Sequence, residues 1–135
     1  MKKILAKIAL VALAATVPVT ASAQAAIEGR WKNEKGSVVV RVAPCGDALC
    51  GFVVDATAKA KAGARKGGTN QLIGTRILSN LHPTGDGTFR GQAFEPKRNI
   101  HVPATVRMIS PGVLSVRGCV LAGLICKEQR WTRVS

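Results

Sequence analysis

Few side chains in this sequence are suited to catalysis. The 135 residues include two His, seven acidic residues and no Tyr, so groups that could exchange protons or attack a substrate are scarce. His82 precedes Pro83 and His101 lies just before Pro103, and neither histidine belongs to an H-E-x-x-H spacing. The glycines form no G-x-G-x-x-G motif, and a glycosidase-like pair of carboxylates remains open although no spacing favours one. We therefore expect a protein that is not an enzyme, with no catalytic residue, no cofactor and no metal site.

The four cysteines are the second group with chemical potential. Cys45 and Cys50 form a C-x4-C spacing, and Cys119 and Cys126 form a C-x6-C spacing. Zinc ligands usually come in pairs separated by two to four residues, so the wider spacing disfavours a zinc site. Disulfides are expected instead. Three pairings are open, and local geometry favours Cys45 with Cys50 and Cys119 with Cys126, because each pair would close a short turn.

Positive charge is the third signal. The sequence has 20 Lys and Arg against seven acids, a formal net charge of +13. Lys59, Lys61, Arg65 and Lys66 gather in one segment and are candidate residues for binding an anionic envelope lipid or glycan. A solvated basic surface without a partner is the alternative. Nucleic acid is a poorer candidate, because two Trp and three Phe provide few platforms for stacking bases.

The N-terminus resembles a targeting segment rather than part of the fold. It has a basic start, an apolar run over residues 8–17 and a small-residue cleavage site that ends at Ala23. These features predict a secretory signal peptide over residues 1–23, with an uncleaved anchor as the alternative. The sequence after it has no apolar stretch long enough to span a membrane. We expect a periplasmic or secreted protein, in which the cysteines are oxidised.

Residues 24–135 are predicted to form a single all-β domain. Apolar and polar residues alternate, and turn residues recur at short intervals. Eight strands are expected, at 28–33, 37–43, 49–55, 75–81, 88–95, 99–109, 113–120 and 126–134. Short glycine-bearing turns favour antiparallel neighbours, and eight such strands close naturally into an up-and-down barrel. Pro103 predicts a bulge or break in the sixth strand, and residues 56–72 predict a long basic loop with a turn or two of helix.

The alternation also indicates which side chains face the interior of such a barrel. The candidates for lining a ligand site lie on the second, third and sixth strands: Val40, Phe52, Val54, Val102, Val106 and Met108. Small apolar residues dominate this set. The interior could therefore hold a slim apolar ligand or be filled by its own side chains, and both readings stay open.

Several segments resemble a bacterial exported family, the domain of unknown function DUF2147. They are GRW at 29–31, VRVAPCGDALCGFVV at 40–54 and VRGCVLAGLICKEQRWTRV at 116–134, and the most specific part is the CGDALCG element. The resemblance implies a lipocalin-like barrel without an established activity, ligand or catalytic residue. Trp31 and Arg133 are similar to the first-strand Trp and last-strand Arg that close such barrels, which would give them a structural role through cation-π attraction.

Taken together, these features predict an exported, non-enzymatic binding module of the bacterial envelope. Its expected ligand is a small hydrophobic or amphipathic molecule at the open end of the barrel. The alternative is an envelope-interaction protein whose basic loop binds an anionic lipid or glycan.

Overall fold

The computed structural model describes residues 9–14, 24 and 26–134 of the chain. Of the predicted signal peptide only residues 9–14 belong to this set, and the expected cleavage site lies outside it. None of the helices in the described part of the chain is long and apolar enough to cross a membrane. Cleavage after Ala23 therefore stays a prediction.

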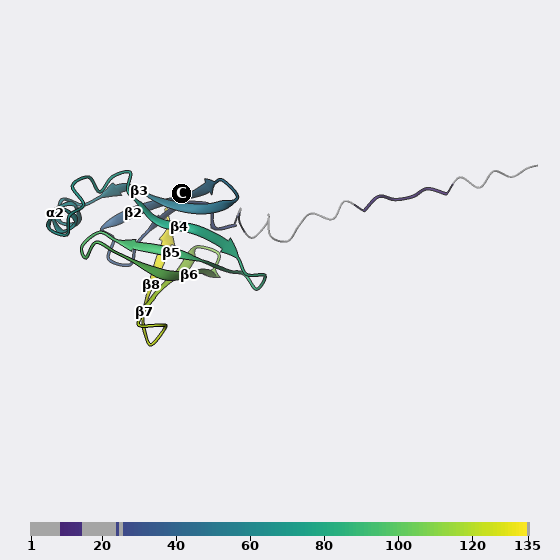
Figure 1. Cartoon of the computed structure of the whole chain (residues 1–135). Helices are drawn as coiled ribbons and strands as arrows, with labels where there is room; N and C mark the ends of the chain where they lie inside the picture. Colours follow the sequence, from purple (N-terminus) through teal and green to yellow (C-terminus); the bar gives the residue numbers. More distant parts are fainter. Residues whose placement is uncertain (1–8, 15–23, 25, 135) are drawn as a thin grey trace, which may run out of the picture.

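Eight strands form one closed antiparallel barrel in chain order, and the last strand returns to pair with the first (Figure 1). The predicted eight-stranded, up-and-down all-β barrel is thus confirmed, with strand bounds within two residues of those expected. The elements are β1 (Gly29–Lys32), β2 (Val38–Cys45), β3 (Ala48–Ala56), α2 (Ala58–Lys66), β4 (Arg76–Pro83), β5 (Thr88–Glu95), β6 (Ile100–Ser110), β7 (Val113–Val120) and β8 (Ile125–Arg133).

The meander gives the barrel two different ends. We call one the open end; it carries helix α2 and the connections at 33–37, 96–99 and 121–124. We call the other the closed end; it carries residues 26–28 and the connections at 46–47, 84–87 and 111–112. Because neighbouring strands run antiparallel, every second connection falls at the same end.

The closed end is built around a buried tryptophan. Trp31 is fully buried, and its Nε1 donates a hydrogen bond of 2.9 Å to the carbonyl oxygen of Ile27. The guanidinium carbon of Arg133 lies 4.2 Å from the centroid of the Trp31 ring. Its nitrogens donate to the carbonyl oxygens of Glu28 at 2.9 Å and Ala26 at 2.6 Å. A cation-π contact of this kind contributes roughly 0.5 to 2 kcal/mol and joins the first strand to the last, where only two residue pairs are in register.

The open end has a helix of nine residues within the segment where the sequence predicts a long basic loop with a turn or two of helix. The side chain of Thr57 caps α2, accepting a 3.1 Å hydrogen bond from the backbone N–H of Ala60. Ala60 and Ala64 are buried against the barrel, which stabilises a nine-residue helix that alanine already favours. The helix ends at Gly67, where a Cβ would overlap the carbonyl oxygen of Pro96. The basic segment is therefore a fixed helix that rests on the β5–β6 turn.

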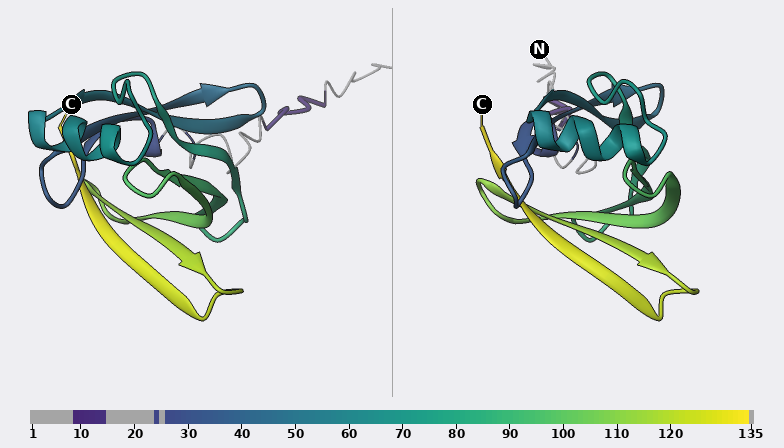
Figure 2. Two further views of the ribbon diagram at one scale, coloured as in Figure 1. Left: turned by 60° about the vertical axis from the view of Figure 1, so that its left-hand side comes forward. Right: turned by 90° about the vertical axis from the view of Figure 1, so that its left-hand side faces the viewer.

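Pro103 affects the sheet in another way than the sequence predicts. Strand β6 is continuous and pairs with β5 on both sides of Pro103. Its pairing with β7 instead begins only at Ala104↔Gly118, next to the proline, which has no N–H to extend that ladder. After Gly118, strand β7 pairs only with β8, and this pairing continues to Val120↔Ile125. The tip of the β7–β8 hairpin reaches away from the rest of the barrel (Figure 2).

Candidate functional site

A cavity of about 370 Å³ lies inside the barrel toward the open end. At roughly 30 Å³ per water it has room for about a dozen water molecules, so it is far larger than an ordinary defect in a core. Its size lies within the range of roughly 300 to 1,000 Å³ found for small-molecule sites. The barrel therefore has a cavity toward its open end, whereas the sequence left open whether the interior is hollow or packed. The apolar wall includes Val40, Val53, Leu78, Val102, Val116 and Trp131.

Small side chains contribute to the space in this part of the barrel. Ala60 and Ala64 of α2 and Ala93 of β5 all line the cavity. Toward the closed end, the large side chains of Phe89 and Leu114 are instead fully buried in a continuous core. The small inward side chains at the open end thus help to make that half of the barrel roomier than the other, while Val40, Leu78, Val116 and Trp131 belong both to the cavity wall and to the core.

The expectation that Phe52 and Val54 face the interior is wrong. Val53 is 1% exposed and lines the cavity, whereas the ring of Phe52 lies on the opposite face of β3, 5.3 Å from the guanidinium carbon of Arg76. Gly51 shares the inward phase with Val53, and a Cβ there would lie 3.0 Å from the nearest side-chain carbon of β2. Because both faces of β3 carry apolar residues, alternation alone cannot distinguish them.

The other four expected lining residues are divided between the two ends. Val40 and Val102 lie in the cavity wall. Val106 is fully buried within the core toward the closed end. Met108 contacts that core and borders a shallow depression at the closed end, beside Arg133. The structure thus places Val106 and Met108 outside the cavity, because β6 runs the full length of the barrel and the cavity does not.

Charged residues surround the mouth of the cavity. Lys35, Lys97, Arg98 and Lys127 line it together with one carboxylate, Glu95. The carboxylate is near one of the cations, with 3.9 Å between Oε1 of Glu95 and Nε of Arg98. The rim therefore has a strong excess of positive charge above an apolar wall. Such a field attracts anionic groups to the opening.

The four candidate anion-binding residues are all on α2, but they do not line the cavity. Lys59, Arg65 and Lys66 are exposed and Lys61 is half-buried. The alanine face of the helix contacts the barrel, so these cations form a separate basic surface beside the mouth. The sequence places these four residues in one segment, and the structure places them on one helix.

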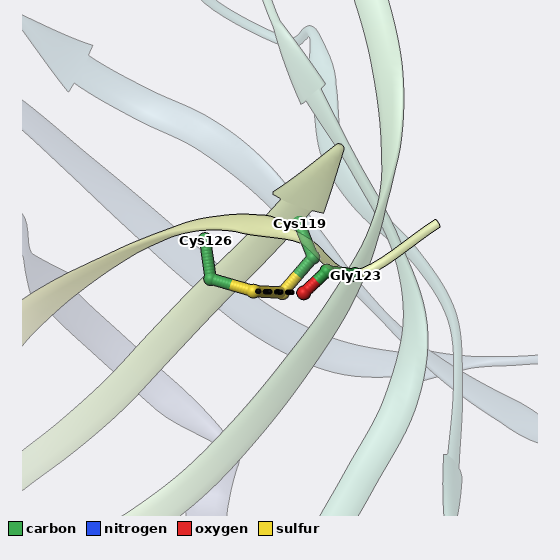
Figure 3. Close-up of a disulfide and its surroundings, with 3 residues drawn as sticks. All are labelled: Cys119, Gly123 and Cys126. Atoms are coloured by element: carbon green, nitrogen blue, oxygen red, sulfur yellow. Dashed lines mark hydrogen bonds between the residues drawn. A yellow bond between two sulfur atoms is a disulfide. The ribbon is translucent and has the colours of Figure 1, made fainter. Parts of the chain in front are cut away.

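The four cysteines form two disulfides, Cys45–Cys50 and Cys119–Cys126, in the pairing that local geometry favours. The first lies at the closed end, and the second spans the end of the β7–β8 hairpin (Figure 3). The Sγ atom of Cys126 lies 3.5 Å from the carbonyl oxygen of Gly123. A disulfide sulfur carries no proton, so this approach is a van der Waals contact that holds the turn compact.

Neither histidine lines the cavity. His82 is exposed on β4, and the ring of His101 lies 4.7 Å from that of Phe94, centroid to centroid. Asp86 lies in the closed-end turn at 84–87, where the Thr84 hydroxyl donates to it at 2.6 Å and the Thr88 N–H at 3.0 Å. These hydrogen bonds lower the pKa of Asp86, so its carboxylate has a structural role in the turn. Within residues 9–14, 24 and 26–134, no three His, Cys, Asp or Glu residues are grouped as a metal site would require.

Sequence reasoning missed part of the site. Trp131 and Gln129 of β8 both line the cavity, and the indole Nε1 of Trp131 donates to Oε1 of Gln129 at 3.1 Å. The period of two along β8 could have shown that Gln129 and Trp131 share the inward face. No pattern in the sequence predicts that the β7–β8 hairpin projects from the barrel, because the projection depends on where the residue pairs between β6 and β7 end.

The fold and the cavity define a class, the lipocalin-like proteins: an eight-stranded antiparallel barrel that is filled at one end and hollow at the other. A similar solved structure is protein HP1028 from the human pathogen Helicobacter pylori, described as belonging to the lipocalin family. It superimposes with a TM-score of 0.63 and 17% identity over 80% of this chain and 82% of that chain. At this identity the likeness shows the fold alone.

The chain belongs to the bacterial family DUF2147, described as an uncharacterized protein conserved in bacteria, whose model matches residues 29–133. The resemblance noted in the sequence is therefore confirmed. A search of curated proteins found no match to this chain. Two disulfides in a member of a bacterial family fit a protein that works outside the cytoplasm, where thiols are not kept reduced.

Proposed function

We propose that this protein is a non-enzymatic binding module of the bacterial envelope that holds a small hydrophobic or amphipathic molecule inside its barrel. The observation that carries the proposal is the cavity of about 370 Å³ with apolar walls and a mouth at the open end. Each Å² of apolar guest surface buried there contributes about 25 cal/mol. The preformed barrel needs little rearrangement to accept a guest, which preserves that gain.

The charged rim favours an amphipathic guest with an anionic head. An apolar chain would contact Val40, Leu78 and Val116 inside, while the head would lie near Lys35 and Lys127 at the mouth. A carboxylate, sulfonate or phosphate head would keep much of its hydration in this position. The ammonium groups would then add attraction without the cost of burying an ion.

A fluorescent anionic amphiphile tests the proposal directly. We expect 1-anilinonaphthalene-8-sulfonate to bind saturably at one site with a rise in emission. Ala93→Leu adds bulk inside the cavity and should weaken this binding about tenfold or more. The matched control Gln92→Leu adds the same side chain at the neighbouring, exposed position of β5. Equal weakening in both variants, or binding that never saturates, would contradict a site inside the barrel.

Mass spectrometry of the protein purified from its own host tests the location and the cargo together. Cleavage after Ala23 and two disulfides predict a denatured mass that starts at Gln24 and lacks four hydrogens. An additional mass present only under native conditions would be the guest, and its value would indicate its class. An uncleaved chain with free thiols would contradict the proposed export to the periplasm or the exterior.

A second candidate function is favoured by the basic surface of α2. Lys59, Arg65 and Lys66 are exposed on a rigid helix, an arrangement suited to an anionic envelope lipid or glycan. Replacing Lys59, Lys61, Arg65 and Lys66 together by Gln should then abolish salt-sensitive binding to anionic vesicles. Unchanged binding of that variant would remove this candidate.

A further inference from the structure

The end of the β7–β8 hairpin exposes an unusual group of large apolar side chains. We call residues 119–126 the hairpin tip. Val120, Leu121, Leu124 and Ile125 are 38%, 65%, 84% and 57% exposed. Isolated exposed apolar residues are ordinary, but a contiguous group on a projecting turn marks a contact surface.

The tip is also built to hold these side chains in fixed positions. The N–H of Leu124 donates to the carbonyl oxygen of Leu121 at 3.1 Å, and the Cys119–Cys126 disulfide closes the loop behind them. Leu121 and Ala122 have φ of 52° and 53°, a region that L side chains avoid and that Gly or Asn occupies more easily. Backbone strain of this kind is concentrated at functional positions. A turn required only to reverse the chain would be relaxed by Asn-Gly and would expose no leucines.

The charges behind the tip suit a lipid surface. On the same hairpin Arg117, Lys127 and Arg130 are exposed against a single acid, Glu128. The apolar side chains lie at the end of the hairpin and the cations lie a few residues away on its strands. This order matches the layers of an anionic bilayer, in which acyl chains lie beneath phosphate groups.

We propose that the hairpin tip inserts into the surface of an anionic phospholipid bilayer and so brings the cavity mouth to the membrane. Val120 and Ile125 belong both to the tip and to the cavity lining, so an apolar path runs from the inserted residues into the barrel. The separation of β7 from β6 beyond Ala104↔Gly118 leaves this side of the mouth unpaired. Docking itself requires no guest; the transfer of a guest along the path rests on the function proposed above.

Vesicle binding by the processed protein tests the docking. The variant Leu121→Ser/Leu124→Ser should bind vesicles of phosphatidylglycerol and phosphatidylethanolamine about 100-fold more weakly than the parent, roughly tenfold for each leucine withdrawn from the acyl region. The matched control Ile109→Ser/Val134→Ser removes two apolar residues that are 44% and 41% exposed near the closed end, and it should bind like the parent. A parent that binds neutral phosphatidylcholine vesicles as well as anionic ones would contradict the role of the cations.

Insertion has a spectroscopic signature of its own. Leu124→Trp should shift its emission to the blue on vesicles and be quenched by lipids brominated in the acyl chains. Unchanged vesicle binding by the serine variant overturns the proposal. The proposal is also overturned if native mass spectrometry shows a smaller oligomer for the serine variant than for the parent, because the tip would then be an interface between copies of the chain. The serine variant should still bind the soluble amphiphile normally without vesicles, so failed docking is distinguishable from a failed cavity.

Discussion

The two ends of the barrel use the same kind of strand for opposite purposes. At the closed end, Trp31 fills the interior and donates a hydrogen bond, while Arg133 satisfies two backbone carbonyls and covers the indole. At the open end the inward positions include alanines and valines beside larger side chains such as Leu78 and Trp131, and together they line a cavity. We therefore expect the closed end to provide most of the stability, with the open end lacking apolar contacts where the proposed guest would bind.

The disulfides repeat this contrast. Cys45–Cys50 lies in a connection next to the core, where Cys50 is fully buried. Cys119–Cys126 lies on the part of the β7–β8 hairpin where β7 no longer pairs with β6. The first stabilises the part of the barrel that must stay folded, and the second holds the shape of a part that projects from it.

Deleting the closed-end tryptophan should have the largest effect. We expect Trp31→Ala to lower the free energy of unfolding by about 3 to 5 kcal/mol, since it removes a fully buried indole and the platform for Arg133. Val102→Ala, which trims a cavity wall, should cost below about 1 kcal/mol because fewer partner atoms lose contacts. Urea denaturation measures both. Similar losses would mean that the two ends contribute alike.

Removing the disulfides one at a time should have the next largest effect. The chain-entropy relation gives about 2 kcal/mol for a loop of the size closed by Cys45 and Cys50, and Cys45→Ser/Cys50→Ser should lose this amount in urea denaturation. Cys119→Ser/Cys126→Ser should lose less, because the hairpin tip can fray alone and so limit the loss. Hydrogen exchange should quicken at the tip in the second variant only. Faster exchange across the whole barrel would instead show that the tip is coupled to the core.

Neutralising the rim should change affinity rather than stability. With Lys35→Gln, Lys97→Gln and Lys127→Gln combined, we expect dodecanoate to bind about tenfold more weakly, a change of about 1.4 kcal/mol, while dodecanol binds as before. The control removes the same charge from α2 through Lys59→Gln, Lys61→Gln and Lys66→Gln. Calorimetry at two salt concentrations measures the difference. Equal effects of the two triple variants would indicate a general field in place of a rim site.

The smallest effect belongs to Asp86, at the closed end. Hydrogen bonds from Thr84 and Thr88 lower its pKa below the ordinary 3.8 in the folded protein. Its contribution to stability is therefore present above pH 3.8 and is lost as the pH falls through the lower folded pKa. Thermal melts should show a small advantage of the parent over Asp86→Asn at pH 6 that disappears in strong acid. The affinity for an amphiphile should be the same in both proteins at pH 6.

Local patterns were enough to predict the barrel but not its interior. Alternation and turn residues located all eight strands, because each depends on neighbours in the chain. The phase of β3 was wrong because Gly51, which faces inward, has no side chain to mark that face. Whether a cavity exists depends on how residues from seven strands and a helix fill one volume, and no local pattern contains that sum.

The candidate surfaces were predictable to different degrees. The basic residues of α2 were visible as a cluster, although their helical form depends on Ala60 and Ala64 being buried by the barrel. The hairpin tip was missed. Its apolar residues lie between two cysteines and look like strand ends, and only the loss of pairing at Pro103 carries them outward.

The short seam between β1 and β8 also determines the order of events as the chain is made. Arg133 reaches carbonyl groups that are 105 and 107 positions earlier in the sequence, so the barrel cannot close until β8 has been delivered as far as Arg133. Until then, β1 and β7 are free edges able to pair with other chains. A nascent chain of this protein thus keeps an open barrel until Arg133 has been made, and a chain cut before Thr132 would have no residues to pair β8 with β1.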